Sequence, residues 1–202
     1  GVAKFEEQLV IILMIDKKKI ESAVKDILAA IGEDTEREGL KETPMRVANM
    51  YEELFSGKNS NLEEHVKVFN EEEVKDQLIL IKDIPFYSMC EHHMLPFFGQ
   101  VSIAYIPSSK KVLGLSKFSR IVSSFSKRLQ VQERLNSQIA EFIYKSVPCE
   151  SVTVIIEAEH LCMTMRGIKS MGSKTLTSAF KGEVSKDFTN QIEIINLLAK
   201  GE

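Results

Sequence analysis

The sequence predicts an α+β protein in which a four-stranded antiparallel sheet carries two helices on one face. Segments rich in β-branched residues occur in two pairs, two segments with helical apolar spacing lie between the pairs, and further helical segments flank them. The expected order is therefore ββααββ, with N-terminal helices before it and one helix after it. The 202 residues suffice for one sizeable domain with a helical extension.

The N-terminal part of the chain is predicted to be helical. An apolar stripe at residues 17–31 ends at Gly32, and Thr43 and Pro44 have the residue types of an N-cap and a first helical position. The first fifteen residues match no pattern and begin with Gly rather than Met. The expected organisation is an unassigned segment at 1–15, a helical region at 16–75 and the main domain at 76–202.

Apolar periodicity assigns the elements of the main domain. Strands are expected at residues 78–86, 98–106, 152–166 and 174–180. Ser116 is the expected N-cap of the first helix, and the second helix is expected to start near Val131. A closing helix is expected at residues 188–198. The other sheet face and both sheet edges would remain open, so we expect copies of the chain to associate edge to edge.

Two short segments hold most of the residues that bind metals well. The segment Cys90-Glu91-His92-His93 contains one of the three cysteines and two of the four histidines of the chain. A further histidine and a further cysteine, His160 and Cys162, lie close together later in the sequence. The C-x-x-H spacing lets one tight turn aim a thiolate and an imidazole at one point, which suits zinc. In a continuous strand, His160, Cys162 and Arg166 would share one face.

The spacing leaves several interpretations of this cluster open. A catalytic metal site would take three ligands and keep an open position, leaving two histidines for acid–base work. A structural site would take four ligands. Without a metal, the histidines would be satisfied core residues, or Cys90 and Cys162 would form a disulfide, although three cysteines in a long chain do not resemble a disulfide framework. The candidate ligands are Cys90, His92, His93, His160 and Cys162.

Composition excludes some classes of function. The net charge of −3 gives no global electrostatic case for nucleic acid or a membrane as partner. The longest early apolar run, residues 9–15, is too short to span a bilayer. The few cysteines indicate a reducing compartment, so we expect a cytoplasmic protein.

Several charged or polar residues have both a structural and a functional interpretation. Lys117 and Arg120 form either a solvated helix face or, with the helix N-terminus, a phosphate site. Arg46 is either a surface arginine or an anion contact. Gln132 and Glu133 lie in the first turn of a helix, where the helix dipole alone favours a carboxylate, but a carboxylate there could also accept two N–H groups of a purine edge.

Several motifs, in the same order, resemble type I GTP cyclohydrolase. They are Ser88–His93, Gly114–Lys117, Gln130–Leu135, His160–Met163 with Arg166-Gly167, and Gly32–Asp34 with Arg37–Lys41 and Thr43-Pro44. The likeness runs from about Ile20 to near Leu198, and its specificity comes from the combination of motifs. One departure is Asn49, where family members often carry a lysine. The contact that this lysine would make with phosphate would be weaker or absent here.

The resemblance implies a fold, an assembly and a set of site residues. The fold is the tunnelling fold, whose subunits join sheets into a barrel, and the assembly is a homodecamer of two stacked pentamers with active sites at subunit interfaces. Zn²⁺ would be held by Cys90, His93 and Cys162, leaving His92 and His160 for proton transfer and Ser116 to assist at the ribose. Guanine would be bound by Gln132 and Glu133, and the triphosphate by Lys117, Arg120, Arg166 and a neighbouring subunit's Arg46.

The reaction implied is hydrolysis of GTP at C8. Zinc would lower the pKa of a bound water, His160 would protonate N7, and C8 would leave as formate before rearrangement to 7,8-dihydroneopterin triphosphate. This is a first step of tetrahydrofolate or pterin biosynthesis, and the sequence leaves allosteric regulation open. One alternative is another pterin or deazapurine enzyme of the same fold. A second is a non-catalytic, zinc-stabilised oligomer that binds nucleotide through a closed four-ligand site.

Overall fold

A computed structural model describes residues 15–74 and 77–199 of the chain. The expectation that residues 1–15 form an unassigned segment therefore falls almost entirely outside the described residues. The chain divides into two compact units, one ending at Asn59 and the other beginning at Ser60. The predicted division near residue 75, between a helical region and the main domain, stays a prediction.

The first unit consists of short helices, as predicted. They are α2 (Lys17–Ala30), α3 (Thr43–Leu54) and the 3-10 helix η1 (Ser56–Asn59). The Asp16 carboxylate caps α2 by accepting a hydrogen bond from the Lys19 amide at 3.1 Å. The N-cap of α3 is Glu42 rather than the predicted Thr43, because Thr43 already has helical backbone geometry and Pro44 follows in the first turn.

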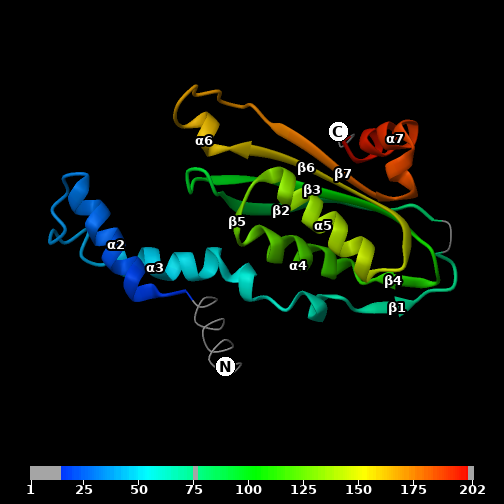
Figure 1. Cartoon of the computed structure of the whole chain (residues 1–202), viewed down its shortest axis with the longest axis horizontal. Coiled ribbons are helices and arrows are strands. Elements are labelled where there is room, and N and C mark those ends of the chain that lie inside the picture. The colour runs from blue at the N-terminus through cyan, green and yellow to red at the C-terminus, as the bar shows by residue number, and fades with distance from the viewer. Residues whose placement is uncertain (1–14, 75–76, 200–202) are drawn as a thin grey trace, which may run out of the picture. The chain divides into compact units, whose positions relative to one another are not determined.

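The second unit contains a five-stranded sheet in the order β5-β2-β3-β6-β7 (Figure 1). The four long strands form an antiparallel meander: β2 (Ile79–Cys90), β3 (Pro96–Pro107), β6 (Cys149–His160) and β7 (Thr175–Gly182). These four strands and the two helices between them confirm the predicted α+β class. The fifth strand, β5 (Leu129–Gln130), pairs in parallel with the end of β2 and was not predicted.

Two helices cover one face of this sheet, as expected. Helix α4 (Leu115–Ser126) and helix α5 (Gln132–Ser146) bury their apolar stripes against β2, β3 and β6 in one contiguous core. The predicted N-cap Ser116 is wrong: Gly114 holds that position, with extended backbone, and Ser116 lies inside the first helical turn.

The opposite face of the sheet is partly covered, contrary to the expectation that it would stay open. Helix α7 (Phe188–Ala199), which follows the 3-10 helix η3 (Glu183–Lys186), packs Leu198 against Ala104 and Ile155 of the sheet. Within residues 15–74 and 77–199, no helix combines the length and the apolar character needed to cross a bilayer.

Three further short elements complete the second unit. The 3-10 helix η2 (Leu62–His65) precedes β1 (Val68–Asn70), which pairs with β4 (Lys111–Leu113) in a separate two-stranded sheet. Neither β1 nor β4 was among the predicted strands. Strands of three residues are too short to show an alternating pattern, so periodicity could not find them.

The strand that carries His160 is shorter than predicted. Strand β6 ends at His160, and the chain turns at once into the short helix α6 (Leu161–Thr164). The Met165 amide donates to the Leu161 carbonyl at 3.1 Å, which closes this helical turn. The expectation that His160, Cys162 and Arg166 share a strand face is therefore wrong, because Cys162 and Arg166 lie beyond the end of the strand.

Candidate active site

A tight turn at the end of β2 carries Cys90 and His93. The Cys90 amide donates to the Leu95 carbonyl and the Met94 amide donates to the Cys90 carbonyl, each at 2.8 Å. Met94 adopts a left-handed backbone conformation with φ of 51°. These contacts fold the turn back on itself, so that a thiol and an imidazole three residues apart are held together.

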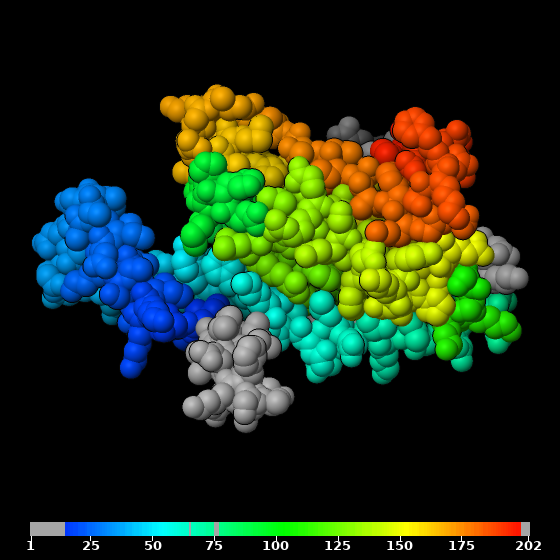
Figure 2. Space-filling view, viewed as in Figure 1, coloured from blue at the N-terminus to red at the C-terminus, as the bar shows by residue number. Residues whose placement is uncertain are grey.

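Helix α6 brings a second thiol to this turn. Potential ligand atoms of Cys90, His93 and Cys162 all lie within 4.8 Å of one another. In Figure 2 the segment around residues 160–172 (gold) lies next to the turn after β2 (green), at one end of the second unit. Of the five candidate ligands that the spacing left open, the three that the family resemblance implied thus lie close together.

The chemistry of this cluster fits a divalent metal ion. Burial raises the pKa of the Cys162 thiol, and the neighbouring Cys90 thiol raises it further. A cation bound between two such thiols would favour their thiolate forms, and two thiolates with one imidazole are a common zinc ligand set. All three cysteines of the chain are free thiols, so the alternative of a Cys90–Cys162 disulfide is wrong. Cys90, His93 and Cys162 can therefore hold a metal ion.

Arg166 lies against this cluster although it is not on the predicted strand face. Its guanidinium Nη1 is 3.0 Å from Nε2 of His93. Since a guanidinium can only donate, Nε2 of His93 accepts this hydrogen bond with its lone pair. The contact places a permanent positive charge next to the two thiols.

A pocket of about 210 Å³ opens beside the metal cluster. Its walls come from the end of β2, the start of β3, the first turn of α5, the end of β6, α6 and the start of β7. The lining residues are Cys90, His92, Phe97, Val131, Gln132, Glu133, His160, Cys162, Met163 and Thr175. The pocket is thus lined by two residues of the metal cluster, by His92 and His160, and by the two residues predicted to bind guanine.

His160 is held firmly on the wall of this pocket. Its ring stacks on Phe97 with centroids 4.8 Å apart and an interplanar angle of 2°, and its Nε2 lies 2.7 Å from Oε1 of Gln132. Burial lowers the pKa of His160 below its ordinary value, and the negative charge of Glu133 partly opposes this shift. His160 is therefore neutral at neutral pH in this structure.

Gln132 lines the pocket but is almost fully buried, in contact with His160. It is 1% exposed, and its amide nitrogen donates to the Ile156 carbonyl, the Thr175 carbonyl and the Thr177 hydroxyl. The neighbouring Glu133 is exposed and lines the pocket. Of the two residues predicted to bind guanine, only Glu133 presents its polar group to the pocket without a hydrogen-bond partner among the described residues.

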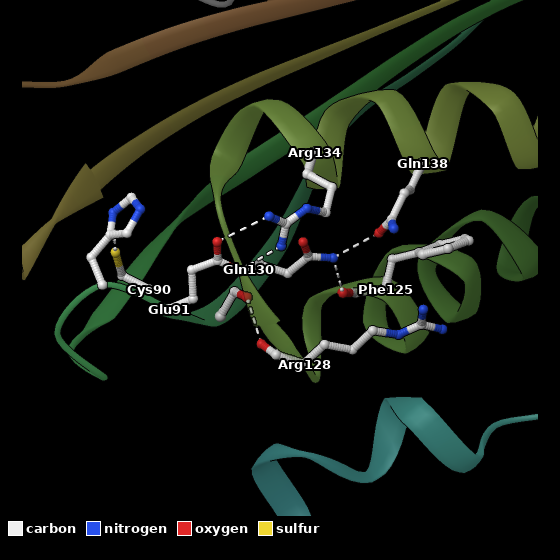
Figure 3. Close-up of polar contacts among 9 residues, drawn as sticks. Cys90, Glu91, Phe125, Arg128, Gln130, Arg134 and Gln138 are labelled. Atoms are coloured by element: carbon white, nitrogen blue, oxygen red, sulfur yellow. Dashed lines mark hydrogen bonds and ion pairs between the residues drawn. The ribbon is translucent and has the colours of Figure 1, made fainter.

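An ion pair ties the metal-binding turn to helix α5 (Figure 3). Arg134 Nη1 and Nη2 lie 2.5 and 2.9 Å from the two carboxylate oxygens of Glu91, and this partner lowers the pKa of Glu91. The Glu91 amide also donates to the Gln130 carbonyl at 3.0 Å. Sequence reasoning missed this link, because no local pattern pairs two residues that lie 43 positions apart.

Comparisons with known proteins show the family of this chain. The family model described as GTP cyclohydrolase I matches residues 20–199. The chain belongs to the GTP cyclohydrolase I family. Proteins named GTP cyclohydrolase 1 from Thermoanaerobacter pseudethanolicus and Caldanaerobacter subterraneus subsp. tengcongensis are 55% and 56% identical to it, each over 92% of this chain and 98% of that protein. The one from Carboxydothermus hydrogenoformans is 54% identical over 92% of this chain and 96% of its own.

Membership of the GTP cyclohydrolase I family confirms the predicted family and, with it, the predicted enzyme class. The alternative of a different pterin or deazapurine family of the same fold is therefore wrong. The assignments of individual residues remain predictions, which the geometry supports to different degrees.

The residues of helix α4 that were predicted to contact the ribose or the triphosphate lie away from the metal cluster, unlike Arg166. Ser116, Lys117 and Arg120 are at the N-terminal end of α4, and Phe118 beside them packs on Tyr105, with ring centroids 5.5 Å apart. The C-terminal end of α4 is the one near the metal turn, because the Ser88 hydroxyl donates to the Ser126 carbonyl at 2.7 Å. A 12-residue helix is about 18 Å long. None of the three α4 residues lines the pocket.

The charged groups in this set differ in their partners. Within the part of the chain that the structure describes, Lys117 and Arg120 have no ion pair. Arg46 belongs to the first compact unit, where its guanidinium pairs with Glu42 at 2.6 Å. Lys117 and Arg120 are thus available to a ligand, and Arg46 has an exposed partner that it can exchange at little cost.

Proposed function

We propose that this chain hydrolyses GTP at C8 of the purine, releases C8 as formate and yields 7,8-dihydroneopterin triphosphate. The observation that carries the proposal is the cluster of Cys90, His93 and Cys162 beside a pocket that also holds His160 and Glu133. The product would enter tetrahydrofolate or pterin biosynthesis. The three free thiols suit a reducing, cytoplasmic location, and the chain's net charge of −3 gives no reason to expect a nucleic-acid or membrane partner.

The metal in this proposal is Zn²⁺, held by Cys90, His93 and Cys162. Zinc with an open position supplies a Lewis acid that lowers the pKa of water to near neutral. Binding of His93 to any metal would use the imidazole lone pair that now accepts from Arg166. Loading the site would therefore release the Arg166 guanidinium, which would become available to a phosphate group of the substrate.

Two histidines and one serine are proposed to handle protons. His160 lines the pocket, and its protonation of N7 would make C8 more electrophilic. His92 lines the same pocket, with Nδ1 3.8 Å from the Cys90 sulfur, and would serve the later ring-opening and rearrangement steps. Ser116 would assist at the ribose.

Recognition of guanine is proposed to depend on Glu133. An ionised carboxylate can accept the two parallel N–H groups that guanine presents at N1 and N2. Glu133 is exposed at the pocket wall, in the first turn of α5, where the positive end of the helix favours its charge. The predicted guanine contact of Gln132 is not favoured, because its carboxamide atoms already have partners inside the protein.

The triphosphate is proposed to bind Lys117, Arg120, Arg166 and Arg46. These groups would orient the substrate without taking part in bond cleavage. Since Lys117 and Arg120 lie a helix length from the metal cluster, one chain is poorly arranged to supply both parts of a site. We therefore propose active sites shared between subunits, with Arg46 also from a neighbouring subunit, in a homodecamer of two pentameric rings.

The exposed edge of β7 supports such an assembly. Among the described strands, β7 (Thr175–Gly182) pairs only with β6, so its other edge offers eight residues of backbone hydrogen-bonding groups to a partner. Edge-to-edge pairing of this kind joins sheets from successive subunits into a closed ring, which removes the unpaired edges.

Formate and pterin release from GTP tests the proposed function. The assay compares the purified oligomer before and after removal of metal with a chelator, and again after zinc is restored. We expect equal amounts of formate and an ultraviolet-absorbing pterin, loss of both with the chelator, and recovery with zinc. A zinc-loaded, folded oligomer that binds GTP but releases no formate would contradict the proposal and favour a nucleotide-binding module.

A further inference from the structure

The buried hydrogen bonds of Gln132 determine which nitrogen of His160 carries the proton. We infer that Gln132 is a positioning residue, which keeps hydrogen on Nε2 of His160 and makes Nδ1 the nitrogen that can exchange a proton with a ligand in the pocket. The identity of that ligand rests on the proposed function, whereas the tautomer rests only on the contacts of this chain.

The orientation of the Gln132 carboxamide follows from its partners. One terminal atom lies 3.0 Å from both the Ile156 carbonyl oxygen and the Thr175 carbonyl oxygen. Backbone carbonyls can only accept hydrogen bonds, so the atom that faces them must be the amide nitrogen, which has two N–H groups to donate. The Thr177 hydroxyl, 3.1 Å away, is a third acceptor on the same side.

A flipped carboxamide would be costly at this position. It would point its oxygen at two carbonyl oxygens and leave them without a donor, in a place where Gln132 is only 1% exposed. Burying a polar group without a hydrogen-bond partner is unfavourable, because the group loses its bonds to water and gains none in return. The amide nitrogen therefore stays with strands β6 and β7, and the amide oxygen faces His160.

The tautomer of His160 then follows directly. Oε1 of Gln132 is 2.7 Å from Nε2 of His160, and an amide oxygen can only accept. Nε2 must therefore be the nitrogen that bears hydrogen. A neutral imidazole has one N–H and one lone pair, so the lone pair is on Nδ1.

The ring is also fixed in direction. Phe97 is fully buried and stacks on the imidazole almost in parallel, so the ring can neither tilt nor swing away without losing this contact. Gln132, in the first turn of α5, thus joins the end of β6 to the start of β7 and holds Nδ1 in one orientation. For the reaction proposed here, Nδ1 would first accept a proton from the water that adds at C8 and would then deliver that proton to N7.

This role predicts different kinetics from direct recognition of guanine. A residue that binds guanine changes KM when it is replaced, whereas a residue that orients a proton donor changes kcat. Misplacement of a reacting group by about 1 Å can cost about 10²-fold in rate. The Gln132→Met variant keeps the length of the side chain and removes its hydrogen bonds, so we expect kcat to fall by about 10- to 100-fold with KM for GTP changed by less than about threefold.

Glu133→Gln is the matched comparison, one position along the same helix. It should raise KM for GTP by about tenfold or more, because a neutral amide cannot accept two N–H groups as a carboxylate does. Zinc stoichiometry should be unchanged in both variants, since neither residue is a metal ligand. A raised KM with unchanged kcat in Gln132→Met would overturn the positioning role.

A spectroscopic measurement tests the tautomer without relying on turnover. The wild-type holoprotein would be labelled with ¹⁵N-histidine, and the His160 signals would be assigned with a His160→Asn variant. We expect ¹⁵N chemical shifts of a protonated Nε2 and an unprotonated Nδ1 at neutral pH. The opposite pattern would refute the inferred tautomer even if the enzyme hydrolyses GTP. The expected pattern would support the tautomer even if the protein released no formate.

Discussion

The two ends of helix α4 differ in how completely one chain builds them. Near its C-terminal end lie the Cys90 turn, the pocket and His160, joined by hydrogen bonds, an ion pair and ring stacking. At its N-terminal end, Lys117 and Arg120 present charges that have no ion pair among the described residues. We call these the metal end and the cationic end.

This difference indicates a division of labour. Chemistry at C8 requires accurately positioned groups, and the groups that we propose for it are fixed by contacts inside one chain. Phosphate binding depends on charge and tolerates more variation in position. Lysine and arginine side chains, which are long and flexible, therefore need no fixed position before a ligand or a neighbouring subunit binds. Substitutions at the metal end should therefore abolish turnover, whereas those at the cationic end should weaken substrate binding.

The largest effect is expected from Cys162→Ala at the metal end. Removal of one of three protein ligands should lower zinc content from one per chain to well below stoichiometric and reduce formate release by about 10³-fold or more. Zinc content is measured by elemental analysis of the purified protein. Stoichiometric zinc in this variant would show that Cys162 is not a ligand.

Cys149→Ser is the matched control for that variant. Cys149 starts β6 and is half-buried, and burial raises its pKa to about 11. About one molecule in a thousand would carry its thiolate at pH 8, so Cys149 should react slowly with iodoacetamide and its replacement should preserve zinc and turnover. Loss of zinc in Cys149→Ser would mean that any cysteine change disturbs the fold.

His160→Ala should separate proton transfer from metal binding. We expect zinc to stay stoichiometric and kcat to fall by about 10²- to 10⁴-fold, the usual contribution of a positioned acid or base. Parallel zinc analysis and formate assays measure the two quantities. Loss of zinc would place His160 among the ligands instead.

Lys117→Ala at the cationic end should act mainly on binding. One lost contact to a phosphate should raise KM for GTP by about tenfold, equivalent to about 1.4 kcal/mol, with a smaller change in kcat. Steady-state kinetics at two salt concentrations would show a weaker salt dependence of KM than in the wild type. An unchanged KM would remove Lys117 from the triphosphate site.

The smallest effect is expected for the Glu91–Arg134 pair. Both side chains are partly exposed, so water screens the pair and it should contribute little to folding. Replacing Arg134 with Met should therefore leave the thermal midpoint nearly unchanged, and lower zinc affinity by only about threefold through a looser turn. A loss of zinc as severe as in Cys162→Ala would show that the turn depends on this pair far more than its exposure suggests.

The sequence predicted the elements of the fold better than the contacts of the site. Apolar periodicity found the four long strands and both covering helices, because each of them buries one regular face. It failed at the end of β6, where the apolar residues after His160 form a helical turn instead of extending the strand. Strands β1 and β4 are too short for any pattern to emerge.

Local spacing predicted the metal-binding turn but left five candidate ligands open, and the choice of Cys162 as the third ligand came from the family resemblance. Cys90 and His93 are three residues apart, and one turn can bring them together. Gln132 forms hydrogen bonds with Ile156 and Thr175, which lie 24 and 43 positions further along the chain. Whether such residues meet in space depends on how α5 packs on the sheet. Sequence alone could therefore place Gln132 near the purine, but could not show that its carboxamide is already occupied.

Mixing subunits with defects at opposite ends tests the division of labour most directly. Cys162→Ala chains and Lys117→Ala/Arg120→Ala chains would be co-expressed in equal amounts, and formate release at low GTP compared with each variant alone. If sites are shared between subunits, about a quarter of the sites in random mixed oligomers regain an intact metal end and an intact cationic end. Turnover near a quarter of the wild-type value is the predicted result. Turnover no greater than the average of the two parent variants would show that one chain supplies both ends and would contradict the account.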